Sequence, residues 1–522
     1  MTFEKFLKDF VPQVAYQSKQ ANLANWILET TGSMDAAELK AQLDTQVRLL
    51  FQDSNTYQKL LEWEKQGAQN PIDARQINVL LRAFKQNLLP RASLEEIAQK
   101  EAHLAQTYAN FRPQLDGQSL SENEIRERLK NEKDPAKRQK VWEASKQIGA
   151  VLAPQILELV RLRNQAARSL GYSDYFQMQL VLQEVDPKWL LGVLDALANQ
   201  SEKAYEQVLG EIVKRQSAQF SLPIAKLGPW AWGDPFCQED PLDSCELDQL
   251  VAGVDIAKAA TQFYKDMGID VTPILQRSDL YERAGKNQHA FCINIDRGED
   301  VRTLNNIQPS IRWLETVLHE LGHAIYELGF DPKLPWLLRE PPHMIPTEAM
   351  ALIAGRQAYR PSALAALVGP CNKELMEKAA RSLRRRQLIF SRWVLVMTAF
   401  ESELYRDPTQ DLNRLWWQYV EKYQKISAPL DRQGQCDWAT KYHLGLAPVY
   451  YFSYLLGEMF ASAIQEALQQ HCGSQELNHP KAGQFLQSKL FAPGNRLSWF
   501  DLIQHVTGKM LTPEPWVKEF AT

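Results

Sequence analysis

The sequence lacks any uninterrupted apolar stretch of the roughly 18 to 20 residues that a membrane-spanning helix requires. The segment from Met1 to Phe10 carries too many charges to form the apolar region of a secretory signal. We therefore expect a cytoplasmic protein without a membrane partner. The removal of a leader ahead of Met1 is compatible with the same sequence.

The sequence also lacks an excess of one charge and closely spaced cysteine pairs. Its 59 basic and 63 acidic residues leave a net charge of -4, which offers no polybasic surface to nucleic acid. The run Arg384 to Arg386 is expected to be a solvated helix face. Scattered cysteines favour free thiols over a disulfide framework. The six are Cys237, Cys245, Cys292, Cys371, Cys436 and Cys472.

No internal repeat or flexible linker divides the chain, yet 522 residues exceed one usual hydrophobic core, so two or more lobes are expected. Helical patterns dominate. Residues 1–110 are predicted to form amphipathic helices with breaks near Gly32-Ser33 and Asn70-Pro71, as a lid or outer wall. A proline-rich loop is expected at 221–245, and one strand at 290–295.

The most informative stretch present is His319-Glu320-Leu321-Gly322-His323. Apolar residues recur at helical spacing from a start at Pro309-Ser310 to a stop at Gly329, so both imidazoles project from one side of a predicted helix. An H-E-x-x-H string arises by chance in about one such sequence in a hundred. Two core histidines are the alternative, but Glu320 would then need its own buried partner.

A catalytic zinc takes three protein ligands and leaves one position open. Glu348 lies 25 residues after His323, beyond a proline-rich connection and in the first turn of a helix predicted to begin at Pro346. A first-turn glutamate often serves only the helix dipole, but the missing ligand favours coordination. The sequence thus predicts one zinc ion per chain, held by His319, His323 and Glu348, although other divalent ions accept the same ligands.

These residues, together with Lys441 to His443 and Tyr450 to Tyr454, resemble the peptidyl-dipeptidase family of angiotensin-converting enzyme. That family belongs to the gluzincin metallopeptidases and shares its fold with thimet oligopeptidase. Ala24 to Trp26 and Leu159 to Asn164 also resemble it, so the likeness covers most of the chain.

The resemblance implies a mainly α fold: a two-lobed helical ellipsoid with a deep central substrate channel and a short β element beside a zinc site. It further implies that residues 1–522 form a single zinc metallopeptidase domain. Within it, residues 285–460 would form the zinc-binding and substrate-binding core.

The resemblance also implies catalytic roles. Glu320 would be the general base that activates a zinc-bound water and carries the proton to the leaving amine. His443 and Tyr454 would donate hydrogen bonds to the oxyanion.

Substrate binding is likewise implied by the resemblance. His289 and the backbone of Ala290 would hold the substrate main chain, while the neighbouring strand adds the peptide at its edge. Lys441 and Tyr451 would capture the terminal carboxylate, with a plain surface charge as the alternative for the lysine. Tyr450 is expected to face away, because i and i+3 spacing pairs Tyr451 with Tyr454 instead.

Some positions depart from the family. Ser453 replaces the arginine of chloride-dependent members, Trp232 stands where a carboxylate-binding glutamine is expected, and Gln288 replaces a cysteine of extracellular members. The resulting hypothesis is a zinc metallopeptidase that acts on short peptides and releases C-terminal dipeptides. A thimet-type endo-oligopeptidase and a catalytically silent peptide-binding scaffold stay open as alternatives. The sequence gives no oligomeric state.

Overall fold

The computed structural model describes residues 2–242, 245–369 and 372–522. Within these ranges the chain is built from helices and two small two-stranded sheets, which confirms the expected mainly α fold. None of the described helices is long and apolar enough to cross a membrane. The chain divides into two compact units, and each combines separate stretches of sequence. The first comprises Met1–Leu88, Ser244–Arg381 and Leu456–Pro515, and the second Leu89–Asp243, Ser382–Leu455 and Trp516–Thr522.

The first unit begins with four helices and then carries the predicted zinc motif. Its helices include α1 (Phe3–Thr31), α2 (Met34–Leu50), α3 (Ser54–Gln66), α4 (Pro71–Asn87), α11 (Ile256–Asp266), α12 (Thr272–Arg277), α13 (Ile311–Leu328), α14 (Met344–Gly355), α15 (Pro361–Val368), α20 (Pro480–Leu486) and α21 (Trp499–Thr507). Three further helices cross from one unit into the other: α16 (Lys373–Arg406), α19 (Phe452–Cys472) and α22 (Glu514–Phe520).

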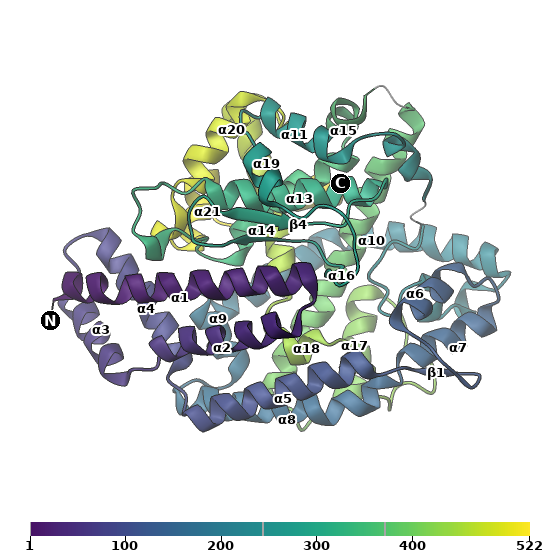
Figure 1. Ribbon diagram of the computed structural model, residues 1–522. Coiled ribbons are helices and arrows are strands. Elements are labelled where there is room, and N and C mark those ends of the chain that lie inside the picture. Colours follow the sequence, from purple (N-terminus) through teal and green to yellow (C-terminus); the bar gives the residue numbers. More distant parts are fainter. Residues whose placement is uncertain (1, 243–244, 370–371) are drawn as a thin grey trace. The chain divides into compact units, whose positions relative to one another are not determined.

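The predicted breaks among the N-terminal helices are confirmed. Gly32 ends α1 in the left-handed region at φ 67°, and the Ser33 side chain then accepts the Ala36 N–H to start α2. Asn70 caps α4 in the same way. The turn at Gly32 brings α2 back alongside α1 (Figure 1).

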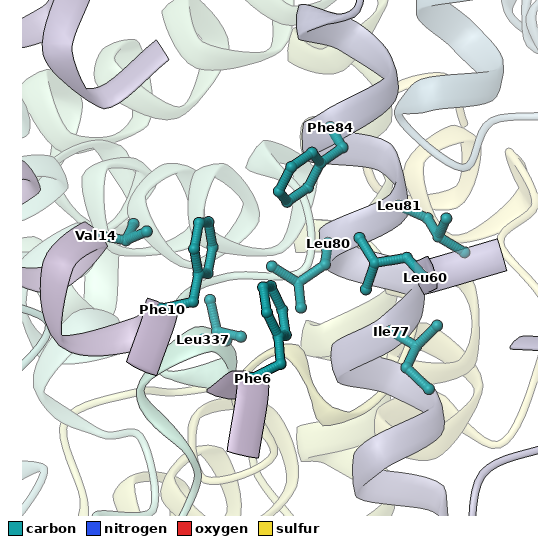
Figure 2. Packing of buried hydrophobic residues seen from close by; sticks show 9 residues of the cluster. All are labelled: Phe6, Phe10, Val14, Leu60, Ile77, Leu80, Leu81, Phe84 and Leu337. Carbon is teal, nitrogen blue, oxygen red and sulfur yellow. The ribbon is translucent and has the colours of Figure 1, made fainter. Parts of the chain in front are cut away.

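A cluster of buried side chains joins α1, α3 and α4 to the short 3-10 turn η4 (Trp336–Leu338) (Figure 2). Aromatic rings of α1 stack on one another, with 5.0 Å between the ring centroids of Phe6 and Phe10. This apolar burial fixes the N-terminal helices to the connection that follows the zinc motif. The cluster consists of Phe6, Phe10, Val14, Leu60, Ile77, Leu80, Leu81, Phe84 and Leu337.

The second unit is also helical, with α5 and α8 lying side by side (Figure 1). It contains α5 (Arg91–Asn110), α6 (Glu122–Asn131), α7 (Pro135–Ser145), α8 (Ile148–Ser169), α9 (Tyr175–Leu182), α10 (Pro187–Phe220), α17 (Leu412–Tyr419) and α18 (His443–Leu446). The strands β1 (Gln114–Leu115) and β2 (Gln118–Ser119) form a hairpin that the sequence did not predict.

The predicted loop before residue 245 is confirmed in its described part, where it contains the 3-10 turns η1 (Ile224–Lys226) and η2 (Pro229–Trp232). The expectation of a solvated arginine run is wrong for Arg385, whose Nε donates to Asp240 Oδ2 of this loop at 2.7 Å. A buried carboxylate requires a partner, and the helix face supplies it.

The second sheet pairs the predicted strand, β3 (Phe291–Asn294), with β4 (Val301–Leu304) in antiparallel register. The N–H of Ile295 donates to the Asp300 carbonyl at 2.8 Å and continues the ladder. Because hydrogen-bonded and open positions alternate, the backbone groups of Phe291 and Ile293 face β4, and those of Cys292 face the opposite, open edge.

Candidate metal centre

The zinc motif lies on α13, whose limits follow the predicted signals. The Ser310 side chain accepts the Trp313 N–H at the start, and Gly329 follows the last residue. Leu314, Leu318 and Leu321 are fully buried on one face. This apolar face fixes the rotation of the helix, and therefore the direction in which the histidines project.

The helix α14 carries Glu348, but it begins earlier than predicted. His343 is its N-cap, and its Nδ1 accepts the Ile345 N–H at 3.0 Å. Glu348 is therefore in the second turn, so the prediction of a first-turn position is wrong. A histidine cap is not one of the usual start signals, which explains the error.

A glycine allows α13 and α14 to approach closely. A Cβ atom added to Gly322 would lie 2.8 Å from the Cα of Ala351, closer than such atoms come in proteins. Gly322 lies between the two histidines in the sequence, at the contact of α13 with α14. Because it has no side chain, the backbone of α14 can come close to α13, and this brings Glu348 near the histidines.

Three predicted ligands converge. The ligand atoms of His319, His323 and Glu348 all lie within 4.8 Å of one another. The two carboxylate oxygens approach the two Nε2 atoms at 3.8 Å and 3.6 Å respectively. Tetrahedral ligands at zinc bond lengths of about 2.1 Å are about 3.4 Å apart, so the spacing suits one such ion.

The chemistry of the donor set also fits a cation. Burial lowers the pKa of His319 to about 4, so its imidazole is neutral and keeps a lone pair. Burial and the Glu458 carboxylate raise the pKa of Glu348 to about 8. A divalent cation between these groups would stabilise the carboxylate charge, and the arrangement therefore suits a metal better than an apolar core.

The sequence analysis missed one contact that orients a ligand and one ion pair whose carboxylate acts on the charge of Glu348. His323 Nδ1 lies 2.8 Å from Thr347 Oγ1, and with that nitrogen donating, Nε2 presents its lone pair to the site. Arg356 Nε donates to Glu458 Oε2 at 3.0 Å, beside Glu348. Thr347 precedes the predicted ligand directly, a position that could have drawn attention to it.

Glu320 lies between the histidines and is buried, with 6% of its surface exposed. Burial and then the Glu348 carboxylate raise its pKa to about 8. A carboxyl group with such a pKa can both take and return a proton near neutral pH. The role of general base stays a prediction.

Beside the motif, His289 is exposed, and its backbone N–H donates to Asn287 Oδ1 at 2.9 Å. Ala290 is half-buried and immediately precedes β3, so its backbone groups belong to the same open edge as those of Cys292. The expected contacts of His289 and Ala290 with a substrate main chain stay predictions.

The candidates for carboxylate binding belong to the second unit. Lys441 is buried, with 8% exposed, so the alternative of a plain surface charge does not hold. Its Nζ donates to Gln238 Oε1 at 3.3 Å and lies 5.7 Å from the ring centroid of Tyr451. Gln238 thus places an amide beside Lys441, whereas the family resemblance led us to expect one at position 232. Gln238 follows Trp232 by six residues in the irregular loop.

The tyrosines differ from the sequence expectation in one respect. Tyr450 does not face away, because its ring centroid lies 5.2 Å from that of Tyr454. Tyr451 is the more buried residue, and its hydroxyl accepts a hydrogen bond from Trp393 Nε1 at 3.0 Å. The predicted pairing of Tyr451 with Tyr454 is confirmed, because their ring centroids lie 5.5 Å apart, although α19 begins only at Phe452.

His443 opens the short helix α18. Burial and the Lys441 charge lower its pKa to about 3, which leaves a neutral imidazole. Its Nδ1 is buried and has no hydrogen-bond partner in the described part of the chain. A neutral imidazole carries one N–H donor. The oxyanion roles of His443 and Tyr454 stay predictions.

The helical fold, the H-E-x-x-H pair and the glutamate on the next helix together define the class of the protein, the metallopeptidases. A sequence model of the peptidase family M3 matches residues 128–329. A model described as angiotensin-converting enzyme matches residues 1–219 and 235–514. The chain belongs to the angiotensin-converting enzyme family.

One curated relative extends this comparison. The chain is 22% identical over 480 residues to the angiotensin-converting enzyme-like protein Ace3 of Mus musculus. The alignment covers 84% of this chain and 64% of that protein, so the chain spans less than two thirds of the relative's length.

Proposed function

We propose that this protein is a zinc peptidase that hydrolyses short peptides and releases dipeptides from their C-terminal ends. The observation that carries the proposal is the convergence of His319, His323 and Glu348 within 4.8 Å of one another. The match to the angiotensin-converting enzyme family supports the same activity. The free thiols of Cys237, Cys292, Cys436 and Cys472 support a reducing, cytoplasmic location, while Cys245 and Cys371 lie outside the described side chains.

His319, His323 and Glu348 would hold the zinc, which when bound supplies a Lewis acid that polarises the scissile carbonyl and lowers the pKa of water. Glu320 takes a proton from the attacking water and returns it to the leaving amine, as its raised pKa allows. By the family resemblance, His443 and Tyr454 donate hydrogen bonds to the oxyanion.

The preference for C-terminal dipeptides rests on Lys441. Its ammonium group is held beside the Gln238 amide and over aromatic rings, with few solvent contacts. A desolvated cation next to an amide donor suits a carboxylate, because the charge-assisted hydrogen bond is not screened by water. Tyr451 borders the same lysine.

A thimet-type endo-oligopeptidase is the second candidate, favoured by the match to peptidase family M3. A silent binding scaffold has less support, since it needs no metal ligand and no buried general base, and this chain has three such ligands and Glu320.

Mass spectrometry of the products from synthetic decapeptides separates these functions. We expect dipeptides from peptides with a free C-terminus and resistance in the same peptides with an amidated end. Internal cleavage of both forms would show an endo-oligopeptidase, and no cleavage in the presence of zinc would exclude a peptidase. The chelator-treated protein provides the control.

A further inference from the structure

A second acidic side chain lies on the same face of α13 as the zinc motif. Glu320, His323 and Glu327 follow one another at i, i+3 and i+7, so they form a single stripe along the helix. The thiol of Cys292 on β3 lies within the electrostatic influence of both Glu327 and Glu320. The stripe therefore runs beside the strand.

The stripe and the strand have a common direction. Side chains of Cys292 and Asn294 project from the same face of β3, because the period of a strand is two. Asn294 Nδ2 donates to Glu327 Oε2 at 3.2 Å. The direction from Glu320 to Glu327 along the helix is therefore the same as the direction from Cys292 to Asn294 along the strand.

Glu327 forms no direct ion pair, and burial raises its pKa to about 7 against the opposing effects of the Asn294 hydrogen bond and the Arg297 charge. Its side chain is half-buried, and no lysine, arginine or histidine nitrogen among the described residues forms an ion pair with it. The nearby Arg297 pairs with Glu340, and its guanidinium lies 4.2 Å from the ring centroid of Trp336. Because Arg297 is paired with Glu340 and Glu327 itself receives only the Asn294 hydrogen bond, a cation brought by a substrate would favour the charged form of Glu327.

The geometry gives the position of that partner in a substrate. Seven helical residues separate Glu320 from Glu327 by about 10 Å, which corresponds to about three residues of an extended peptide. At the edge of β3 opposite β4, the Asn294 carbonyl already accepts a hydrogen bond from Asn22 Nδ2 of α1 at 3.1 Å, so a peptide can pair only beside Ala290 and Cys292. Added there in the more common antiparallel sense, the peptide has its N-terminal side toward Asn294.

We propose that Glu327 selects substrates with a positive charge about three residues on the N-terminal side of the cleaved bond. This inference rests on the proposed peptidase function. The cation is either the free amino group of a short peptide or a lysine or arginine side chain in a longer one.

The test uses the zinc-loaded enzyme and peptides with one fixed C-terminal sequence. In N-acetylated peptides, lysine is compared with norleucine at the second to fourth positions before the cleaved bond. In short peptides, a free amino group at the N-terminus is compared with an acetylated one. We expect kcat/KM to be roughly tenfold higher for the cationic member of at least one pair. The pair that responds identifies the source of the charge.

Glu327→Gln retains the acceptor for Asn294 and removes the charge, so the ratio between cationic and neutral peptides should fall to near one. Glu377→Gln makes the same charge change at a residue with 52% of its side chain exposed and should leave the ratio as in the wild type. Ratios near one in the wild type, or a ratio unchanged in Glu327→Gln with full zinc content, would overturn the proposal.

If no peptide is cleaved, the proposed peptidase function is wrong, and the inference about Glu327 is then tested by binding. Calorimetric titration of the wild type and of Glu327→Gln with the same peptides then decides the inference. Tighter binding of the cationic peptide to the wild type alone supports Glu327 as a recognition residue, and equal or absent binding excludes it.

Discussion

At the scale of single residues, burial determines the chemistry of the candidate centre. Burial keeps His319 and His323 neutral, as metal ligands must be, and it raises the pKa of Glu320 to about 8, close to the pH at which a general base and acid exchanges its proton. Within the described part of the chain, Glu320 forms no hydrogen bond or ion pair that would give it a structural role, and Glu348 is the charged group that raises its pKa.

Glu320→Gln should lower kcat by at least a hundredfold with zinc still bound, because the amide cannot accept the proton but leaves the ligands in place. Steady-state kinetics and metal analysis of the same preparation measure both quantities. Activity close to that of the wild type would remove the general base from the mechanism.

Thr347→Val should weaken zinc binding by about 10-fold to 100-fold, since His323 loses the hydroxyl that orients its ring. Competition with a chelator of known affinity measures this change. Thr347→Ser retains the hydroxyl and should bind zinc nearly as the wild type does. Equal affinities in all three proteins would show that the contact does not orient the ligand.

At the scale of elements, the site depends on the packing of α13 against α14. The helices meet at Gly322, where the Ala351 backbone leaves no space for a side chain. Gly457 of α19 is also close, because an added Cβ would lie 3.1 Å from Glu348 Cγ. Glycines on α13 and α19 thus leave the space that α14 and its Glu348 side chain occupy.

Gly322→Ala should lower the free energy of unfolding by about 1 to 3 kcal/mol through overpacking, and it should weaken zinc binding by displacing α14. Gly210→Ala on α10 is the matched control, because nothing lies within 4 Å of the added atom. We expect that control to gain about 0.5 to 1 kcal/mol from reduced backbone entropy. Denaturant unfolding measures both, and an unaffected Gly322→Ala would show that α14 can shift without loss.

At the scale of the whole molecule, the predicted roles are distributed over both units: the metal ligands belong to the first, and Lys441, His443 and Tyr454 to the second. Helices such as α16 and α19 continue from one unit into the other. The predicted central channel and the domain limits at 1–110, 285–460 and 1–522 stay predictions.

Recognition of the peptide carboxylate should depend on pH through Lys441. Burial lowers its pKa to about 8, so the amino group is charged below that pH and becomes neutral above it. We expect KM for peptides with a free C-terminus to rise as the pH increases from 7 to about 9. Lys441→Gln should remove this dependence, and a profile identical in that variant would exclude the lysine.

The sequence by itself determined the class of the protein and much of its centre. The helical periodicity from Leu314 to Leu328 placed His319 and His323 on one side of α13, and the need for a third ligand identified Glu348. These inferences succeeded because they depend on local spacing and ligand chemistry.

Only the tertiary structure decided which distant residues support that centre. Thr347 against His323, Gln238 beside Lys441 and the Asn294 contact of Glu327 join segments that no local period relates. The strand β4 and the histidine cap of α14 were missed for the same reason, since four residues and an unusual cap carry little local preference. Local spacing fixes how a helix presents its side chains, whereas packing between elements selects their partners.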